Sequence, residues 1–143
     1  MIRCQRGRSE LNQNLTKIGI IAIVDDDEPL REALGSVLKA AGFLIDTFAS
    51  AEDFLASPRS REIACLILDI RLPGMSGIEL QRRLSESGCT IPVIFVTAHG
   101  DASLRDMLLK AGAAGFLNKP VRSDTLLREI HSALGKIEST EHP

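Results

Sequence analysis

The sequence contains neither tyrosine nor tryptophan, and phenylalanine occurs only five times among 143 residues. Binding through stacked bases or aromatic cages is therefore disfavoured, because both need several exposed aromatic rings. No apolar run approaches the roughly 18 to 20 residues that a membrane-spanning helix needs, so no membrane association is expected. Residues 1–17 are polar and lack the apolar core of a signal peptide, and we expect them to form a flexible leader.

The chain also lacks a large excess of charge and a paired cysteine motif. Its 17 basic and 19 acidic side chains give a net charge of -2, and the basic ones are spread along the chain. No direct contact with nucleic acid is expected from this distribution. The three cysteines, Cys4, Cys65 and Cys89, form no C-x-x-C pair and indicate neither a disulfide framework nor a zinc site. A reducing, cytoplasmic setting is expected.

What the chain does contain is an alternation of short apolar runs and helical patterns. With 44% apolar residues the chain can bury one core, and we expect one domain at 18–137 followed by a frayed tail at 138–143. The apolar runs are too short for amphipathic helices and predict strands that are covered on both faces, as in a parallel sheet. The predicted strands are 18–24, 43–48, 63–68, 92–96 and 115–118.

Helix start and stop signals stand between these runs. Asp27 can cap the first helix, Pro29 suits its first turn, and Gly42 ends it. The later helices have the predicted caps Ser50, Ser76, Asp101 or Ser103, and Ser123. Five strands that alternate with five helices predict a three-layer α/β domain with right-handed crossovers.

Apolar residues at helical spacing predict which helix faces are buried. The first helix has the predicted buried set Leu30, Leu34, Val37, Leu38 and Ala41. The helix after Asp101 has the set Leu104, Met107, Leu108 and Ala111, of which we expect Leu104, Met107 and Leu108 to be core rather than partner surface. The last helix has Leu126, Leu127, Ile130 and Leu134.

Polar side chains follow four of the predicted strands where each strand ends. The first run ends in Asp25 and Asp26, the third in Asp69, the fourth in Thr97, and the fifth leads into Lys119. Parallel strands present their carboxyl ends on one edge, where ligands collect. Carboxylates about 4 Å apart repel by roughly 4 kcal/mol at an effective dielectric near 20, so a divalent cation or the lysine must offset them. Oxygen ligands without nearby histidine or cysteine favour Mg²⁺.

This set of groups matches the requirements of phosphoryl transfer, which needs a nucleophile, a metal and donors for the phosphoryl oxygens. In this interpretation Asp69 is the nucleophile and Asp26, with Asp25 nearby, holds the metal. Thr97 hydrogen-bonds one phosphoryl oxygen and Lys119 neutralises another. Each of these residues taken singly would be an ordinary cap, turn or surface residue, and only their joint placement favours a functional site.

Four motifs then carry a resemblance to a known family. They are V-D-D-D-E-P-L-R at 24–31, L-I-L-D-I-R-L-P-G-M-S-G at 66–77, V-T-A at 96–98 and A-G-A-A-G-F-L-N-K-P at 111–120. In this order and spacing they resemble the receiver domain of bacterial two-component response regulators, over about residues 18–135. The resemblance implies a doubly wound, flavodoxin-like (βα)5 fold with strand order 2-1-3-4-5.

The same resemblance implies a signalling phosphoacceptor rather than an enzyme. Asp69 would take a phosphoryl group from a sensor histidine kinase or a phosphotransfer protein. Asp25, Asp26 and Asp69 would bind Mg²⁺ together with the backbone carbonyl of Arg71. The bond between Lys119 and Pro120 would be cis, although only about 5 to 6% of X-Pro bonds are.

Thr97 and Phe116 match the switch pair of this family. Phosphorylation would draw the Thr97 hydroxyl inward and let the Phe116 ring rotate into the vacated space. The face made by the helix after Asp101, strand 115–118 and the last helix would then change its partner, with a homodimer as one outcome.

Several positions depart from the family pattern or leave a question open. Phe116 lacks the hydroxyl that a tyrosine would bring, and Val121 replaces an aromatic residue often seen there. Arg71 and His99 lie where family members tune dephosphorylation, so the lifetime of the phosphoryl group stays open. The segment T-A-H-G-D at 97–101 resembles receivers joined to a helix-turn-helix domain, and none follows Gly135. A free-standing receiver and a shortened chain are both consistent with this.

Three other functions remain open from the residues. A Mg²⁺-dependent phosphohydrolase could use Asp25 of a D-x-D motif as its nucleophile, but Pro29 stands where that class usually has threonine. A flavin-binding domain of this topology would need a hydroxyl-rich loop after the first strand, and here that loop is acidic. A pseudo-receiver would act through protein contacts alone, without phosphorylation.

Overall fold

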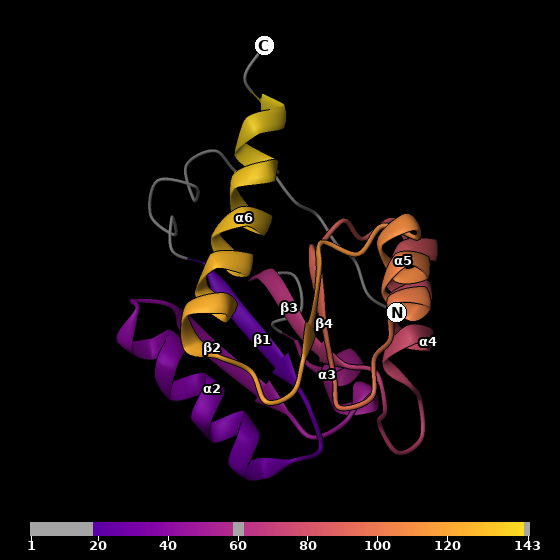
Figure 1. Cartoon of the computed structure of the whole chain (residues 1–143), viewed down its shortest axis with the longest axis horizontal. Coiled ribbons are helices and arrows are strands. Elements are labelled where there is room, and N and C mark those ends of the chain that lie inside the picture. The colour runs from indigo at the N-terminus through magenta and orange to yellow at the C-terminus, as the bar shows by residue number, and fades with distance from the viewer. Residues whose placement is uncertain (1–18, 59–61, 142–143) are drawn as a thin grey trace.

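The computed structural model describes residues 19–58 and 62–141, the side chains of 136–141 excepted, and shows five strands alternating with five helices (Figure 1). The elements are β1 (Ile20–Val24), α2 (Glu28–Ala40), β2 (Leu44–Phe48), α3 (Ala51–Ala56), β3 (Ile63–Asp69), α4 (Gly77–Glu86), β4 (Val93–Thr97), α5 (Ala102–Lys110), β5 (Gly115–Asn118) and α6 (Ser123–Glu141). All strand pairs are parallel, in the order β2-β1-β3-β4-β5. The predicted fold class and strand order are therefore confirmed. The expected leader at 1–17 lies outside the described residues.

Side-chain caps begin four of the helices, as the sequence predicts. Each cap oxygen accepts a hydrogen bond from a backbone N–H three residues later, which satisfies one of the otherwise unpaired amides of the first turn. The caps are Asp27, Ser50, Ser76 and Asp101. Asp101 rather than Ser103 is thus the cap of α5. Ser123 is the first residue of α6 and not its cap, because the Arg122 carbonyl already accepts from the Leu126 amide at 2.9 Å.

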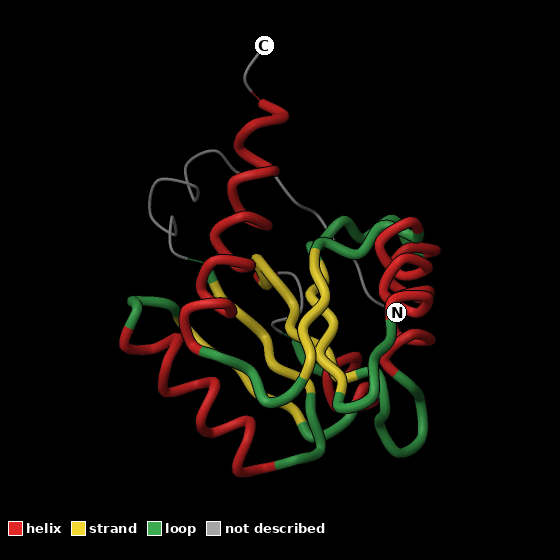
Figure 2. Tube along the Cα trace, in the orientation of Figure 1, coloured by secondary structure: helices red, strands yellow, loops and turns green. Residues whose placement is uncertain are grey.

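The helices cover the two faces of the sheet in separate groups (Figure 2). Helices α3, α4 and α5 pack on one face through residues such as Phe54, Leu80 and Leu108. Helices α2 and α6 pack on the other through Leu38 and Ile130. Alternate residues of β1, β3 and β4 enter the two clusters, so these strands are buried on both faces. Strand β2 is at the edge, as predicted, and its Leu44 side chain is 57% exposed.

Three members of the predicted buried helix faces are exposed instead. Ala41 and Ala111 are the C-terminal cap residues of α2 and α5 and lie beyond the last turn that packs on the sheet. Met107 is 53% exposed, because α5 contacts the core through Leu108 and, less deeply, Leu104. A shared helical face in the sequence is therefore broader than the strip that α5 buries.

The remaining boundaries agree with the predictions to within a few residues. Helix α6 runs through 138–141, so regular structure extends beyond the boundary expected at 137. Cys65 is buried in β3, and Cys89 is disulfide-bonded, which the cysteine pattern did not indicate. Among the described residues, no helix has the length and apolarity needed to cross a membrane.

The location of the core predicts that the same substitution, leucine to alanine, changes the free energy of unfolding very differently at two positions. Leu80→Ala removes a fully buried side chain and should lower the free energy of unfolding by about 2–5 kcal/mol, since it leaves a cavity under α4. Leu44→Ala on the exposed edge should change the same free energy by less than about 0.5 kcal/mol. Urea unfolding followed by far-ultraviolet circular dichroism measures both. Equal losses in the two variants would contradict this assignment of the core.

Candidate functional site

The parallel register brings the predicted site residues to the same edge of the sheet. Val24 at the end of β1 pairs with Leu68, which precedes Asp69 in β3. Asp69 pairs in turn with Val96 of β4, one residue before Thr97. On the far side of β4, the Lys119 amide donates to the Thr97 carbonyl at 2.8 Å. Residues from four separate chain segments thus end side by side.

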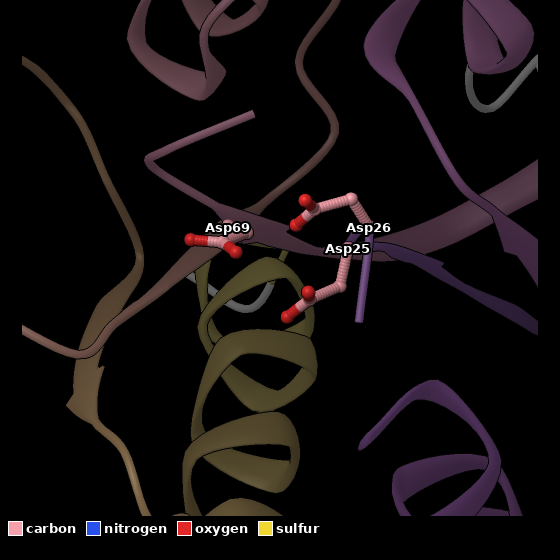
Figure 3. Close-up of side chains that lie close together, drawn as sticks. All are labelled: Asp25, Asp26 and Asp69. Atoms are coloured by element: carbon pink, nitrogen blue, oxygen red, sulfur yellow. The ribbon is translucent and has the colours of Figure 1, made fainter. Parts of the chain in front are cut away.

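Three carboxylates converge at this edge (Figure 3). Asp25 and Asp26 extend from the end of β1 towards Asp69 at the end of β3, and one oxygen of each lies within 4.8 Å of the others. Asp25 is 2% exposed and Asp69 is 5% exposed, whereas Asp26 lies on the solvent side. A cluster of carboxylate oxygens at this spacing suits a hard divalent cation such as Mg²⁺.

Lys119 joins the two buried carboxylates. Its Nζ lies 3.1 Å from Asp25 Oδ2 and 3.1 Å from Asp69 Oδ2. Burial raises the pKa of the Asp69 carboxyl, and the Asp25 charge raises it further, while Lys119 and the Arg71 amide act in the opposite direction. Burial would lower the pKa of the Lys119 amine, but its hydrogen bonds to Asp25 and Asp69 outweigh burial and raise it. The ammonium form of Lys119 is therefore favoured within the pocket.

Backbone groups fix the orientation of both buried carboxylates. Asp25 Oδ1 accepts from the Asp27 amide at 2.9 Å, and the Asp25 carbonyl accepts from Arg31 Nη1 at 2.7 Å. Asp69 Oδ1 accepts from the Arg71 amide at 3.1 Å. Each carboxylate thus offers one oxygen to the backbone and the other to Lys119. Three carboxylates against one ammonium still leave an excess of negative charge, which a cation would offset.

The predicted switch pair lies beside this pocket. Thr97 is buried at the end of β4, and its Oγ1 accepts from the His99 amide at 3.3 Å. Phe116 pairs with Phe95 in the sheet and is half-buried against the α3–α5 side of the core. A Cβ on Gly100 would lie 2.5 Å from Phe116 Cζ and 2.7 Å from Thr97 Cγ2. The backbone of residue 100 therefore contacts both members of the pair.

Sequence reasoning did not single out Gly100 or Gly77 as site residues. A Cβ on Gly77 would collide with the backbone carbonyl oxygen of Asp69, so α4 begins directly against the backbone of that residue. Neither glycine has a positive φ, and no local pattern reveals its role. The bond between Lys119 and Pro120 is cis, as predicted. Val121 packs at the edge of the α2–α6 side of the core.

Comparisons with known proteins agree with this geometry. A family model described as "Response regulator receiver domain" matches residues 21–131. The response regulator protein TodT of Pseudomonas putida is 40% identical over 131 residues, which are 92% of this chain and 56% of that protein. The transcriptional regulatory protein FixJ of Bradyrhizobium diazoefficiens is 36% identical over 124 residues, 87% of this chain and 60% of that protein. The chain thus spans a little over half the length of these relatives.

Solved structures give the same result. A structure of the response regulator StyR matches with a TM-score of 0.77 at 43% identity, covering 85% of this chain and 62% of that one. The structure of FixJ-N matches with a TM-score of 0.73 at 38% identity, covering 82% of this chain and 94% of that one. Both identities are high enough for the likeness to extend beyond the fold.

The contact at Gly77 predicts that one substitution will have opposite effects at two helix positions. Gly77→Ala should lower the free energy of unfolding by about 1–3 kcal/mol, because the Asp69 backbone cannot move away from the added methyl group. Gly135→Ala in α6 meets no atom within 4 Å and should instead raise it by about 0.4–1 kcal/mol. Urea unfolding measures both values. A stabilising Gly77→Ala would show that the close approach to Asp69 is not required.

Proposed function

The chain belongs to the response regulator receiver family, and from this premise we propose that its Asp69 accepts a phosphoryl group from a sensor histidine kinase with the help of Mg²⁺. As a member of that family it is a signalling phosphoacceptor rather than an enzyme that turns over a separate substrate. One observation carries the proposal. Asp69 is buried, is held by Lys119 at 3.1 Å, and has the carboxylates of Asp25 and Asp26 within 4.8 Å.

The residues around Asp69 would divide the work of the transfer. An Asp69 carboxylate oxygen forms the new bond to phosphorus, while the bond from phosphorus to the imidazole nitrogen of the donor breaks and its electron pair stays on that nitrogen. Lys119, whose Nζ donates to Asp69 Oδ2 at 3.1 Å, would pair with an incoming phosphoryl oxygen. The Thr97 hydroxyl would donate to another. The Arg71 amide keeps Asp69 oriented during the reaction.

Mg²⁺ would be held by Asp25, Asp26 and Asp69 together with the Arg71 carbonyl. When bound, it would offset the negative charge of the pocket and of the phosphoryl oxygens. The exposed position of Asp26 supports entry from solvent, since Asp25 and Asp69 are both buried beneath it. This ligand set contains only oxygen atoms, which agrees with the preference of the ion.

Phosphorylation would be read by the pair of Thr97 and Phe116. An added phosphoryl group carries a charge of about -2 and three acceptor oxygens. We infer that it attracts the Thr97 hydroxyl. The contact of Gly100 with both side chains supports a direct mechanical link, because a shift of Thr97 changes the space beside the Phe116 ring. The β4–α5 loop would move with them.

The partners follow from the same proposal. A cognate histidine kinase or a phosphotransfer protein would supply the phosphoryl group in the cytoplasm. The face of α5, β5 and α6 would bind the next partner, or a second copy of the chain, without direct contact to nucleic acid. The exposure of Met107 and of Leu109 on α5 supports a contact there, since large apolar side chains gain from being covered.

The acceptor assignment predicts which carboxylate is labelled. Incubation with acetyl phosphate and Mg²⁺ should add the mass of one phosphoryl group to the protein, and borohydride trapping should map it to Asp69. Asp69→Asn should abolish the label, because the amide is a poor nucleophile. Asp106→Asn, on the exposed side of α5, is the matched control and should be labelled like the wild type. Absence of label in the wild type would favour the pseudo-receiver. A label on Asp25 would favour the phosphohydrolase.

The switch assignment predicts that phosphorylation of Asp69 can be separated from the conformational response at Phe116. Thr97→Ala should still be labelled on Asp69, but the NMR signals of Phe116 should change much less on phosphorylation, because the hydroxyl that senses the phosphoryl group is missing. Thr47→Ala on the exposed edge strand is the control and should respond like the wild type. If Thr97→Ala shows the full wild-type change at Phe116, the pair is not the switch.

A further inference from the structure

The loop between β3 and α4, residues 70–76, starts at the proposed phosphoacceptor. Its first part is tied inwards, because Ile70 and Leu72 are buried and the Arg71 amide donates to Asp69 Oδ1 at 3.1 Å. Its two ends are joined by a hydrogen bond from the Gly77 amide to the Ile70 carbonyl at 2.9 Å. The tip of the loop, around Gly74 and Met75, is the part that these bonds leave unsupported.

A side chain from α3 supports this tip. Glu52 Oε2 accepts from the Met75 amide at 2.9 Å across 23 positions of the sequence. Gly74 adopts a φ of +76°, and a Cβ there would lie only 2.6 Å from the same Glu52 oxygen. The turn thus brings the backbone directly against the carboxylate, at a position where only glycine fits easily. The Met75 amide is also the main reason why the pKa of Glu52 lies below its usual value.

Helix α3 is a firm base for such a contact although it has only six residues. Ser50 caps its first turn, and Ala51 and Phe54 are fully buried on its inner side. Phe54 also packs edge-on against Phe48 of β2, with ring centroids 5.4 Å apart. Glu52 therefore projects towards the loop from a backbone that is anchored on the opposite side.

We propose that Glu52 is a positioning residue for the metal site. It holds the tip of the 70–76 loop against α3 and so keeps the Arg71 carbonyl in place for Mg²⁺. This inference rests on the proposed function, because it takes the Arg71 carbonyl as a ligand. Glu52 acts through the loop and does not itself contact the reacting groups. Its contribution is therefore to metal affinity and not to the transfer step at saturating metal.

Four variants separate the hydrogen bond from the charge. Glu52→Ala removes both, Glu52→Asp keeps the charge but shortens the reach, and Glu52→Gln removes the charge but keeps an acceptor oxygen. Asp53→Ala is the matched control, because it removes a carboxylate from the next, also exposed, position of α3. The measurements are Mg²⁺ affinity by calorimetry, exchange of the Met75 amide by NMR without metal, and acetyl phosphate labelling over a range of Mg²⁺ concentrations.

Loss of the contact should weaken metal binding. Glu52→Ala and Glu52→Asp should raise the Mg²⁺ dissociation constant by about three- to tenfold and speed Met75 amide exchange by a similar factor. Both variants should reach the wild-type labelling rate at saturating Mg²⁺. Glu52→Gln and Asp53→Ala should stay within about twofold of the wild type in affinity and exchange.

The remaining outcomes would overturn the inference. Unchanged Met75 exchange in Glu52→Ala would show that the carboxylate does not hold the loop. Faster exchange with an affinity like that of Asp53→Ala would show that the loop tip does not position a metal ligand. A Glu52→Gln variant as weak as Glu52→Ala would assign the effect to charge alone. Failure of the wild type to bind Mg²⁺ or to be labelled would instead refute the proposed function.

Discussion

The site depends on the repulsion between Asp25 and Asp69 and on the ammonium group that offsets it. Two buried carboxylates so close together would be unstable alone, since burial and like charge both disfavour their ionised forms. Lys119 Nζ stands 3.1 Å from an oxygen of each. The two acids come from the adjacent strands β1 and β3, whereas the amine comes from the end of β5, two strands away from β3. The strand order therefore brings the charges together. The ion pairs in turn link the chain segments at the C-terminal ends of β1, β3 and β5.

The same arrangement connects the proposed acceptor Asp69 to the proposed switch pair through β4. Its end is hydrogen-bonded on one side to the chain after Asp69, from the Ile70 amide to the Val96 carbonyl at 3.2 Å. On the other side it is bonded to Lys119, whose amide donates to the Thr97 carbonyl at 2.8 Å. A change at Thr97 would thus act on a backbone that is already hydrogen-bonded to the chain after the proposed acceptor Asp69 and to the chain after β5, the strand of Phe116. This is a physical reason why Thr97 on β4 suits the proposed role of sensing the phosphoryl group.

Much of the fold and of the candidate site could be predicted from the sequence, because the signals for strand ends and helix caps are local. Apolar runs that end in polar residues located the strand ends, and side-chain caps such as Asp27 located the helix starts. The burial of Met107 was predicted wrongly, because helical spacing defines a face but not how much of it a neighbour covers. The contact of Glu52 with Met75 had no signal at all, since it joins helix α3 to the loop between β3 and α4, and only the packing of α3 brings these two segments together. Gly77 was missed for the same reason, as its close neighbour is the Asp69 backbone.

The distribution of burial around the three carboxylates suggests how an ordered site could still admit the proposed metal ion and phosphoryl donor. Asp25, Asp69 and Thr97 are buried and held by backbone amides, so their geometry is set before any ligand arrives. Asp26 and Glu52 are exposed, and hydrogen bonds in contact with water open more easily than buried ones. The exposed side chains of Asp26 and Glu52 can therefore move while the buried ones stay ordered. Because Asp25, Asp69 and Thr97 are already fixed in the free protein, a ligand would need to order only the exposed side chains. This lowers the entropic cost of binding.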